Sequence, residues 1–218
     1  PIRHIKTCSA ASICNYLSPP GRFLRARFKP LGDLRTVARR LRKKILIRLY
    51  DADAEKYELQ HGAEQMPKVR DAIRMAPPRY PVLDVGCGTG LLLRELSMMS
   101  VGLDISRGML RVASSRTRAE LVLGDMERMP FRSESFASVY SLTSVQLADD
   151  VVEAMSEIAR VAKRGSTIIV SAHRSTEASR KLASAAAIAG LRVVQEKPPD
   201  DVNVDRMLVC TKDLHDYY

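Results

Sequence analysis

The sequence predicts an α/β protein with a mostly parallel β-sheet that is covered by helices on both faces. Short apolar runs alternate with amphipathic helical patterns over residues 81–210, an order that is typical of parallel sheets. A glycine-rich turn at residues 86–90 follows the first run, and acidic residues, Asp104 and Asp125, follow the next two. Because the carboxyl ends of parallel strands meet at one edge of the sheet, we expect a ligand site there.

The first strand and its turn are predicted from the stretch PVLDVGCGTG at residues 81–90. Three glycines, Gly86, Gly88 and Gly90, lead into a helix that begins at Leu91. Such a turn lets the backbone approach a ligand closely and directs free helix N–H groups towards it. The G-x-G-x-G spacing lacks the third glycine of the dinucleotide pattern and the lysine of the NTPase phosphate loop. The turn therefore predicts close ligand contact without either phosphate-binding signature.

The later elements follow from the same alternation. Ser106 is the expected N-cap of the helix after the second strand, and Gly190 is the expected C′ residue that closes a helix at 175–189. The segment Lys163 to Gly165 is expected to end the helix before the fifth strand. The expected strands are 101–105, 120–124, 135–142, 166–172, 191–196 and 206–211, and the remaining expected helix spans 149–162.

Composition narrows the class of protein. The chain has 218 residues, of which 45% are hydrophobic, as in globular proteins that bury a core. No apolar run is long enough to span a bilayer, and no secretory signal is recognisable. The four cysteines are Cys8, Cys14, Cys87 and Cys210, and they form no C-x-x-C pair. We therefore expect reduced thiols, no metal site and a cytoplasmic location.

The positive charge is concentrated at the N-terminus. Residues 1–48 hold thirteen Lys and Arg residues and one acid, Asp33, so the formal charge of this part is +12. The remaining residues carry −2, which gives the net charge of +10 for the whole chain. Residues 1–33 are expected to form a basic arm without regular structure. Three interpretations stay open for this arm: an ordered arm, an organelle-targeting segment, or a start site placed too far upstream.

A basic amphipathic helix is expected from Leu34, with Asp33 as its N-cap. Its apolar positions share one face, and arginines and lysines occupy much of the rest. One interpretation is contact with RNA or another anionic surface. The other is a solvated charged face on a helix that packs over the domain. No aromatic residues interleave for base stacking. Three units are expected: the arm 1–33, N-terminal helices 34–76, and a ligand-binding domain 77–218.

Three motifs resemble those of class I S-adenosylmethionine-dependent methyltransferases of the type 11 group. They are DVGCGTG at residues 84–90, DIS with a following Met-Leu at 104–110, and GDMERMPF at 124–131. The resemblance covers about residues 50–211. It implies a Rossmann-like, doubly wound, seven-stranded sheet whose last strand is antiparallel, with an N-terminal helical extension. It also implies S-adenosylmethionine as the cofactor.

The resemblance implies a role for each motif. The glycines would shape the loop against the methionine portion, with Asp84 near the cofactor's ammonium group. Asp104 would bind the ribose hydroxyls, and Asp125 and Met126 would meet the adenine. The residues expected to bind the cofactor are Tyr50, Tyr57, Asp84, Gly86, Cys87, Gly88, Gly90, Asp104, Ile105, Met109, Asp125, Met126 and Ser141.

The stretch from Tyr50 to Glu58 resembles the segment that lies over the cofactor as a lid in this family. Tyr50 and Tyr57 are therefore lid candidates, and the alternative is that they pack a helix on the domain. Residues 62–65 are expected to break the lid into two helices. The loop at 143–146 carries no acid, His or Lys, so no catalytic residue is assigned; positioning of nucleophile and methyl group supplies much of the rate in such reactions.

Three functions follow as hypotheses. The first is a methyltransferase acting on RNA or the translation machinery, which the basic N-terminal region favours. The second is a small-molecule methyltransferase similar to those of quinone pathways. The third is a non-catalytic partner that holds the cofactor. An activating protein partner is also compatible with the sequence, which does not reveal the acceptor atom or the oligomeric state.

Overall fold

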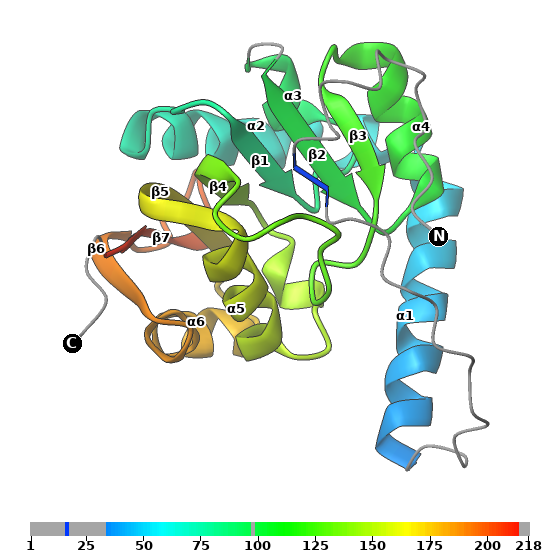
Figure 1. Cartoon of the computed structure of the whole chain (residues 1–218). Coiled ribbons are helices and arrows are strands. Elements are labelled where there is room, and N and C mark those ends of the chain that lie inside the picture. The colour runs from blue at the N-terminus through cyan, green and yellow to red at the C-terminus, as the bar shows by residue number, and fades with distance from the viewer. Residues whose placement is uncertain (1–15, 18–33, 97–98, 214–218) are drawn as a thin grey trace.

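A seven-stranded sheet forms the centre of the molecule in the computed structural model, which describes residues 16–17, 34–96 and 99–213 (Figure 1). The strand order is β3-β2-β1-β4-β5-β7-β6. β7 is antiparallel to both of its neighbours, and the pairs among β1 to β5 are parallel, so the predicted fold class is confirmed. The strands are β1 (Val82–Val85), β2 (Ser100–Asp104), β3 (Glu120–Leu123), β4 (Phe136–Ser141), β5 (Ala162–His173), β6 (Leu191–Lys197) and β7 (Asp205–Lys212).

Helices cover both faces of this sheet. α5 and α6 pack on one face, and α2, α3 and α4 contact the strands on the other. α1 packs beside α4 and then extends past the edge of the sheet (Figure 1). The helices are α1 (Leu34–Asp53), α2 (Tyr57–Met75), α3 (Leu91–Arg94), α4 (Arg107–Arg116), the 3-10 helix η2 (Val145–Leu147), α5 (Val151–Val161) and α6 (Glu177–Ile188).

The larger core cluster lies between the sheet and α5 and α6. Leu83, Val139 and Ile168 from three adjacent strands are fully buried there, together with Met155 and Ile158 of α5. α5 presents these residues on one face because they recur at helical spacing. This packing fixes the strand ends, and therefore the edge of the sheet at which the ligand site was expected.

The predicted caps are present. The Ser106 side chain accepts a hydrogen bond from Met109 N at 3.1 Å, which satisfies one free donor at the start of α4. Gly190 follows α6 with a φ of 75°, a left-handed conformation that favours glycine. The cap of α1 was predicted at Asp33, which lies outside the described residues.

The predicted helix break at residues 62–65 is wrong. α2 continues through Gly62 and Pro67, and the chain turns earlier, between α1 and α2. Ala54 in that turn is 1% exposed and packs with Met109 and Val112 of α4. Burial of this turn against α4 therefore sets the position of the break, and the flexibility of glycine does not.

The fifth strand was predicted to begin at Ser166, after the segment Lys163 to Gly165, and it begins earlier. β5 begins at Ala162, directly after α5, and Ala162 pairs with Phe136 of β4. The register then shifts before Ser138, and Gly165 has a φ of 67°. An irregularity of this kind lets a strand absorb extra residues while staying in the sheet, so the helix and strand need no separate loop.

Part of the predicted arm is described. Leu17 forms a β-bridge with Phe131, and the Tyr16 ring stacks on the Phe136 ring with centroids 5.3 Å apart. The backbone amide of Arg132 donates to Tyr16 O at 2.7 Å. These two residues of the arm therefore lie against the edge of the core. No helix in the described part of the chain is long and apolar enough to cross a membrane.

Replacing Gly62 by alanine tests the continuity of α2. A Cβ atom at this position meets only Glu58 Cβ, at an ordinary 3.8 Å. Glycine inside a helix costs about 1 kcal/mol relative to alanine, so Gly62→Ala should raise the free energy of unfolding by about 0.5–1 kcal/mol in urea denaturation. Gly90→Ala is the control and should destabilise the protein, because φ is +87° and the Cβ would lie 2.6 Å from Thr117 Cγ2. A loss of stability in Gly62→Ala would contradict the continuous helix.

Candidate functional site

The glycine turn after β1 adopts a conformation that only glycine accepts without strain. Gly86, Gly88 and Gly90 have φ values of 73°, 53° and 87°. A Cβ at Gly86 would lie 2.4 Å from Ser144 Cβ, so this glycine also permits close packing of the turn against the loop after β4. Gly86 N donates to Leu103 O at 2.7 Å, which ties the turn to β2.

Asp104 connects the turn to the end of β2. Its carboxylate accepts from Gly88 N at 2.9 Å and from Ser106 N at 2.8 Å. Burial raises the pKa of Asp104, while the backbone N–H groups of Ser106 and Gly88 oppose that rise by stabilising the charged form. The carboxylate therefore holds both turns at the sheet edge in fixed positions.

Asp84 lies inside β1 and is 3% exposed. Burial, followed by the negative charge of Asp104, raises the pKa of this carboxyl to about 8. A carboxyl with such a pKa is mostly protonated at neutral pH, and a cation bound beside it would favour its ionised form. Its environment is therefore suited to a positively charged group of a ligand.

The acidic segment after β3 is paired with α1. Asp125 Oδ1 accepts from Glu127 N at 3.0 Å, and Asp125 Oδ2 accepts from the Lys43 ammonium at 2.5 Å. Lys43 also forms a short ion pair with Glu127. Burial lowers the pKa of Lys43, but its hydrogen bonds to Asp125 and Glu127 outweigh burial and raise it overall. A lysine from the basic helix therefore reaches the carboxylate that was expected to meet adenine.

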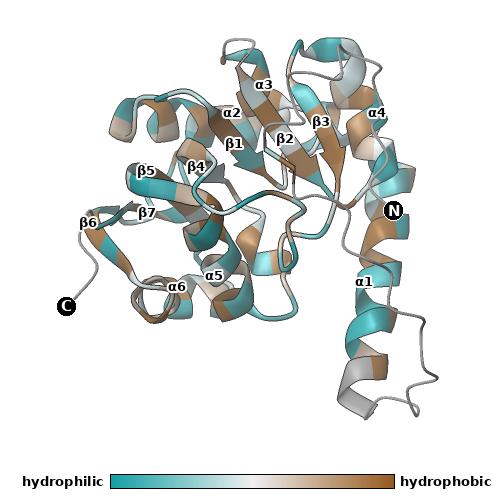
Figure 2. Cartoon of the chain, in the orientation of Figure 1, coloured by the Kyte–Doolittle hydropathy of each residue, from teal (hydrophilic) through white to brown (hydrophobic). Residues whose placement is uncertain are grey.

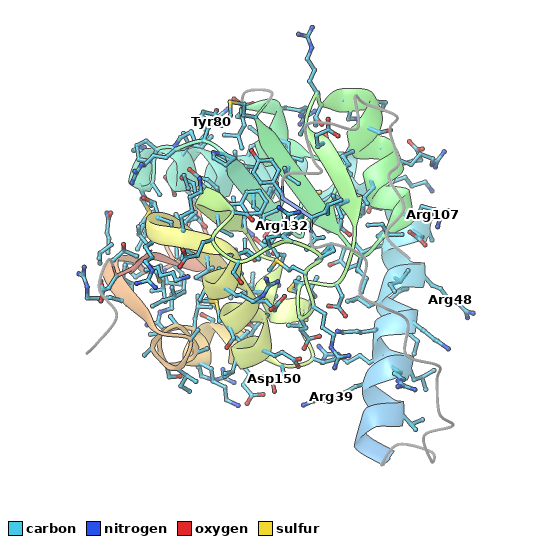
Figure 3. The ribbon with its side chains drawn as sticks, viewed as in Figure 1. Arg39, Arg48, Tyr80, Arg107, Arg132 and Asp150 are labelled. Carbon is cyan, nitrogen blue, oxygen red and sulfur yellow. The ribbon has the colours of Figure 1, made fainter. Side chains whose placement is uncertain are left out.

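Further ion pairs hold α1 on the domain. Arg42 pairs with Asp149 at 3.3 Å, and Arg39 lies 3.8 Å from Asp150. Figure 3 shows the Arg39 side chain directed towards the domain, on the side where Asp150 lies. At the other end of the helix, Asp51 accepts hydrogen bonds at the start of α4, from Ser106 Oγ at 2.6 Å and Gly108 N at 2.7 Å.

The two lid candidates lie side by side above the edge of the sheet. The Tyr50 and Tyr57 rings have centroids 6.3 Å apart, and the His61 ring lies 4.9 Å from that of Tyr57. Both tyrosines are partly buried and pack against the cluster of Ala54, Met109 and Val112. Burial raises the pKa of both hydroxyls, to about 12 for Tyr57, so they stay protonated hydrogen-bond donors at neutral pH.

Three neighbouring cavities meet at Tyr57. The first, the nucleoside cavity, runs from Gly86 past Asp104 to Asp125. The second lies between Asp84 and the glycine turn. The third, which we call the acceptor-side cavity, has a volume of about 360 Å³. Its lining residues come from α1, α2, the loop after β4 and the end of β5, and they are Leu46, Leu49, Tyr50, Asp53, Tyr57, His61, Glu64, Gln65, Thr143, Gln146 and His173.

The structure places nearly all of the predicted site residues on these walls. Asp84 and Cys87 line the second cavity. Gly90 and Ser141 line none of the three: Gly90 caps α3, and the buried Ser141 hydroxyl is bonded to Ser144 Oγ at 2.7 Å. The nucleoside cavity is lined by the others, which are Tyr50, Tyr57, Gly86, Gly88, Asp104, Ile105, Met109, Asp125 and Met126.

Sequence reasoning missed a buried polar network beneath the acceptor-side cavity. The Lys68 ammonium and the Asp205 carboxylate are fully buried and lie 2.9 Å apart, and Lys68 also pairs with Glu64 at 2.7 Å. Asp205 accepts from Thr143 Oγ1 at 2.7 Å. Thr143 has a φ of 55°, and its backbone N donates to Ser171 Oγ at 2.9 Å. The loop at 143–146 thus lacks acid, His and Lys of its own, but the fold brings such groups to it.

One signal for this network was present in the sequence. Lys68 precedes Val69 and stands four residues before Ala72, so it shares the helix face of these two buried apolar residues. A lysine at a core position needs a buried carboxylate partner. The identity of that partner, Asp205, depends on the pairing of β5 with β7, which connects segments far apart in the chain.

This arrangement of glycine turn, strand-end carboxylates and cavities defines an α/β domain that binds a nucleoside-containing cofactor. Residues 83–170 match the methyltransferase domain family. The sequence is 36% identical over 98 residues to malonyl-[acyl-carrier protein] O-methyltransferase of Serratia marcescens, covering 43% of this chain and 38% of that protein. It is 32% identical over 132 residues to demethylmenaquinone methyltransferase of Corynebacterium kroppenstedtii, covering 56% of this chain and 57% of that one. The chain thus spans less than two thirds of these relatives.

Solved structures show the same fold. One is a putative methyltransferase of Haloferax volcanii in complex with the Trm112 methyltransferase activator, with a TM-score of 0.67, 21% identity, and coverage of 78% of this chain and 98% of that one. Another is the magnesium protoporphyrin IX methyltransferase of Synechocystis with bound S-adenosylhomocysteine, with a TM-score of 0.65, 15% identity, and coverage of 79% and 100%. The family match at residues 83–170 and the shared fold support a class I S-adenosylmethionine-dependent methyltransferase domain in this chain. S-adenosylmethionine is the cofactor of that family.

Substituting Lys43 tests the attachment of α1. Lys43→Met removes the cation shared by Asp125 and Glu127, and leaves these acids without it. We expect the free energy of unfolding to fall by about 1–3 kcal/mol, the cost of stranding a charged hydrogen-bonded group. Lys44→Met, an exposed position on the same helix, is the matched control and should change stability by less than about 0.5 kcal/mol. Equal stabilities of the two variants in denaturant would show that Lys43 does not hold α1.

Proposed function

We propose that this protein transfers the methyl group of S-adenosylmethionine to an acceptor held in the acceptor-side cavity. The observation that carries the proposal is the meeting of all three cavities at Tyr57. S-adenosylmethionine, when bound, would supply an electrophilic methyl group, and the residues around Tyr57 would hold the acceptor next to it. The protein's task is then to align two ligands across one point and to exclude water.

The cofactor roles follow the geometry of the walls. Asp104 lies at the end of β2, where a carboxylate meets ribose hydroxyls in nucleoside sites. Asp84 supports the cationic amino group in the adjoining cavity. Asp125 and Met126 contribute to the far end of the nucleoside cavity, where adenine would lie. Lys43 must share the Asp125 carboxylate with the adenine amino group or leave it. We propose residues 34–76 as the lid and 77–218 as the catalytic domain.

A small-molecule acceptor is the form of this proposal that we favour. The acceptor-side cavity of about 360 Å³ is within the range of small-molecule sites, about 300–1,000 Å³. Leu46 and Leu49 give it an apolar side, and His61, Glu64 and His173 give it a polar one. The two curated relatives described above are named for malonyl-[acyl-carrier protein] and demethylmenaquinone. A proton released by the acceptor has His61, Glu64 and His173 within the same cavity as candidate bases.

RNA is the second candidate acceptor, and its support is reduced. Arg39, Arg42 and Lys43 are paired with carboxylates of the domain, so these three cations are not free to meet phosphates. The remaining basic residues of α1 are the basis for this alternative. An RNA acceptor would show affinity that falls steeply with salt. A protein activator is a further proposal, because the Haloferax volcanii neighbour is in complex with one.

Transfer of labelled methyl groups distinguishes a methyltransferase from a protein that binds the cofactor without catalysis. The purified chain is incubated with labelled S-adenosylmethionine and fractions of a cell extract, and small molecules are separated from RNA and protein. Label in the small-molecule fraction supports the favoured acceptor class, and label confined to RNA supports the second candidate. Cofactor binding without transfer to any fraction would overturn the proposal of catalysis.

Asp104→Ala tests the cofactor site. Removing this carboxylate strands its hydrogen-bond partners, so the free energy of S-adenosylmethionine binding should weaken by about 1–3 kcal/mol, roughly a tenfold to hundredfold rise in Kd. Calorimetric titration measures Kd, with NAD as the control ligand. Asp201→Ala, in an exposed loop, is the matched control. Thermal unfolding of Asp104→Ala confirms that the variant is folded. An unchanged Kd would remove Asp104 from the site.

The raised pKa of Asp84 predicts proton release on binding. With a pKa of about 8 in the free protein, most Asp84 carboxyls are protonated at pH 7. A bound cation lowers this pKa, so binding expels the proton and affinity rises with pH towards 8. Calorimetry at pH 7 in two buffers of different ionisation enthalpy measures the proton. Asp84→Asn should release close to one proton fewer than the wild type, and equal release by the two proteins would contradict the assignment.

A further inference from the structure

The outer face of α1 carries a row of exposed aliphatic side chains. Val37, Leu41, Ile45 and Leu49 are 45%, 57%, 51% and 58% exposed. Residues four apart lie on the same face of a helix, so these side chains form one stripe along α1. Figure 2 shows apolar patches along the part of α1 that extends past the sheet. Contiguous exposed aliphatic surface of this kind marks an interaction site.

A row of cations runs beside the aliphatic stripe. Arg40, Lys44 and Arg48 each precede one of its residues and are exposed. Figure 3 shows Arg48 directed away from the domain, opposite in direction to Arg39. Among the described residues, no carboxylate forms an ion pair with these three cations. The helix thus has two sets of cations: the inner set holds the domain, and the outer set faces solvent beside apolar surface.

We propose that this outer face of α1 docks on an anionic lipid bilayer. A helix with an aliphatic stripe and flanking cations lies in the plane of the interface, with the apolar side chains at the acyl boundary and the cations at the phosphate headgroups. A single bilayer would then contact both the aliphatic stripe and the row of outer cations. Docking of this kind needs neither cofactor nor methyl transfer, so it stands apart from the function proposed above.

Nucleic acid fits the same face less well. A phosphate backbone would pair with Arg40, Lys44 and Arg48 but would leave the four aliphatic side chains in water. Tyr50 is the aromatic residue of α1, and it is half-buried against α4, so the outer face offers no ring for base stacking. The aliphatic row is the feature that selects a lipid surface over RNA.

The position of Leu49 determines which part of the domain would face the bilayer. Leu49 is the last residue of the aliphatic stripe and also lines the acceptor-side cavity. A bilayer that contacts the stripe would therefore lie near the entrance of that cavity. If methyl transfer takes place as proposed, a lipid-embedded acceptor with a polar head would reach the cavity from the membrane surface.

Vesicle flotation tests the proposal with the full chain. We expect binding to vesicles of phosphatidylcholine mixed with phosphatidylglycerol, and binding about tenfold weaker to phosphatidylcholine alone, because headgroup charge contributes to each cation's attraction. The double variant Leu41→Gln/Ile45→Gln should lose most of the binding at unchanged charge. Circular dichroism and thermal unfolding establish that each variant is folded.

A charge-matched pair separates the outer cations from general surface charge. The outer triple variant should lose the preference for anionic vesicles, while a control triple variant on the far side of the domain should keep it within about twofold. The outer variant is Arg40→Gln/Lys44→Gln/Arg48→Gln, and the control is Lys163→Gln/Lys181→Gln/Arg192→Gln.

Several outcomes would overturn the proposal. They are equal binding to neutral and anionic vesicles, no binding to either, and binding that Leu41→Gln/Ile45→Gln leaves unchanged. Single-stranded RNA bound by the outer cations, without vesicle binding, would make RNA the occupant. A dimer in sedimentation that Leu41→Gln/Ile45→Gln abolishes, again without vesicle binding, would make a second copy of this chain the occupant.

Discussion

The hydrogen bonds of the Asp104 carboxylate are the interaction on which the site depends. This one side chain holds Gly88 N in the turn after β1 and Ser106 N in the turn after β2. Parallel strands bring those turns to the same edge, but the sheet alone does not fix their relative position. Burial of Asp84 itself, and then the negative charge of Asp104, raise the pKa of Asp84. Asp104 thus holds the two turns and also contributes to the rise in the pKa of Asp84.

α1 is held to this edge at two points. Asp51 binds the start of α4, and Lys43 binds Asp125 and Glu127 after β3. Between these points the helix carries Tyr50 over the nucleoside cavity. The basic character that suggested an external anionic partner is thus partly used inside the molecule. A cation of α1 pairs with the domain or faces solvent according to the direction in which its side chain leaves the helix. The number of charges in the sequence does not give this direction.

Local patterns predicted the strands, the glycine turn, the Ser106 cap and the strand-end carboxylates, because each depends on a few neighbouring residues. The errors arose where distant packing decides. Gly62 stays helical because the chain turns earlier, at the buried Ala54. Lys43 reaches Asp125, and Lys68 reaches Asp205, across long stretches of sequence. No spacing rule within a segment contains these pairs, so the acceptor-side cavity could not be described before the fold was known.

The antiparallel β7 sets an order for the assembly of the molecule. Asp205, the first residue of this strand, is the buried carboxylate that receives Thr143 and Lys68 beneath the acceptor-side cavity. The nucleoside cavity draws its walls from residues 43–148. A chain emerging from the ribosome therefore has every residue of the nucleoside side available while the support of the acceptor side is still unsynthesised. The acceptor-side cavity therefore depends on a carboxylate that is synthesised after all of its lining residues.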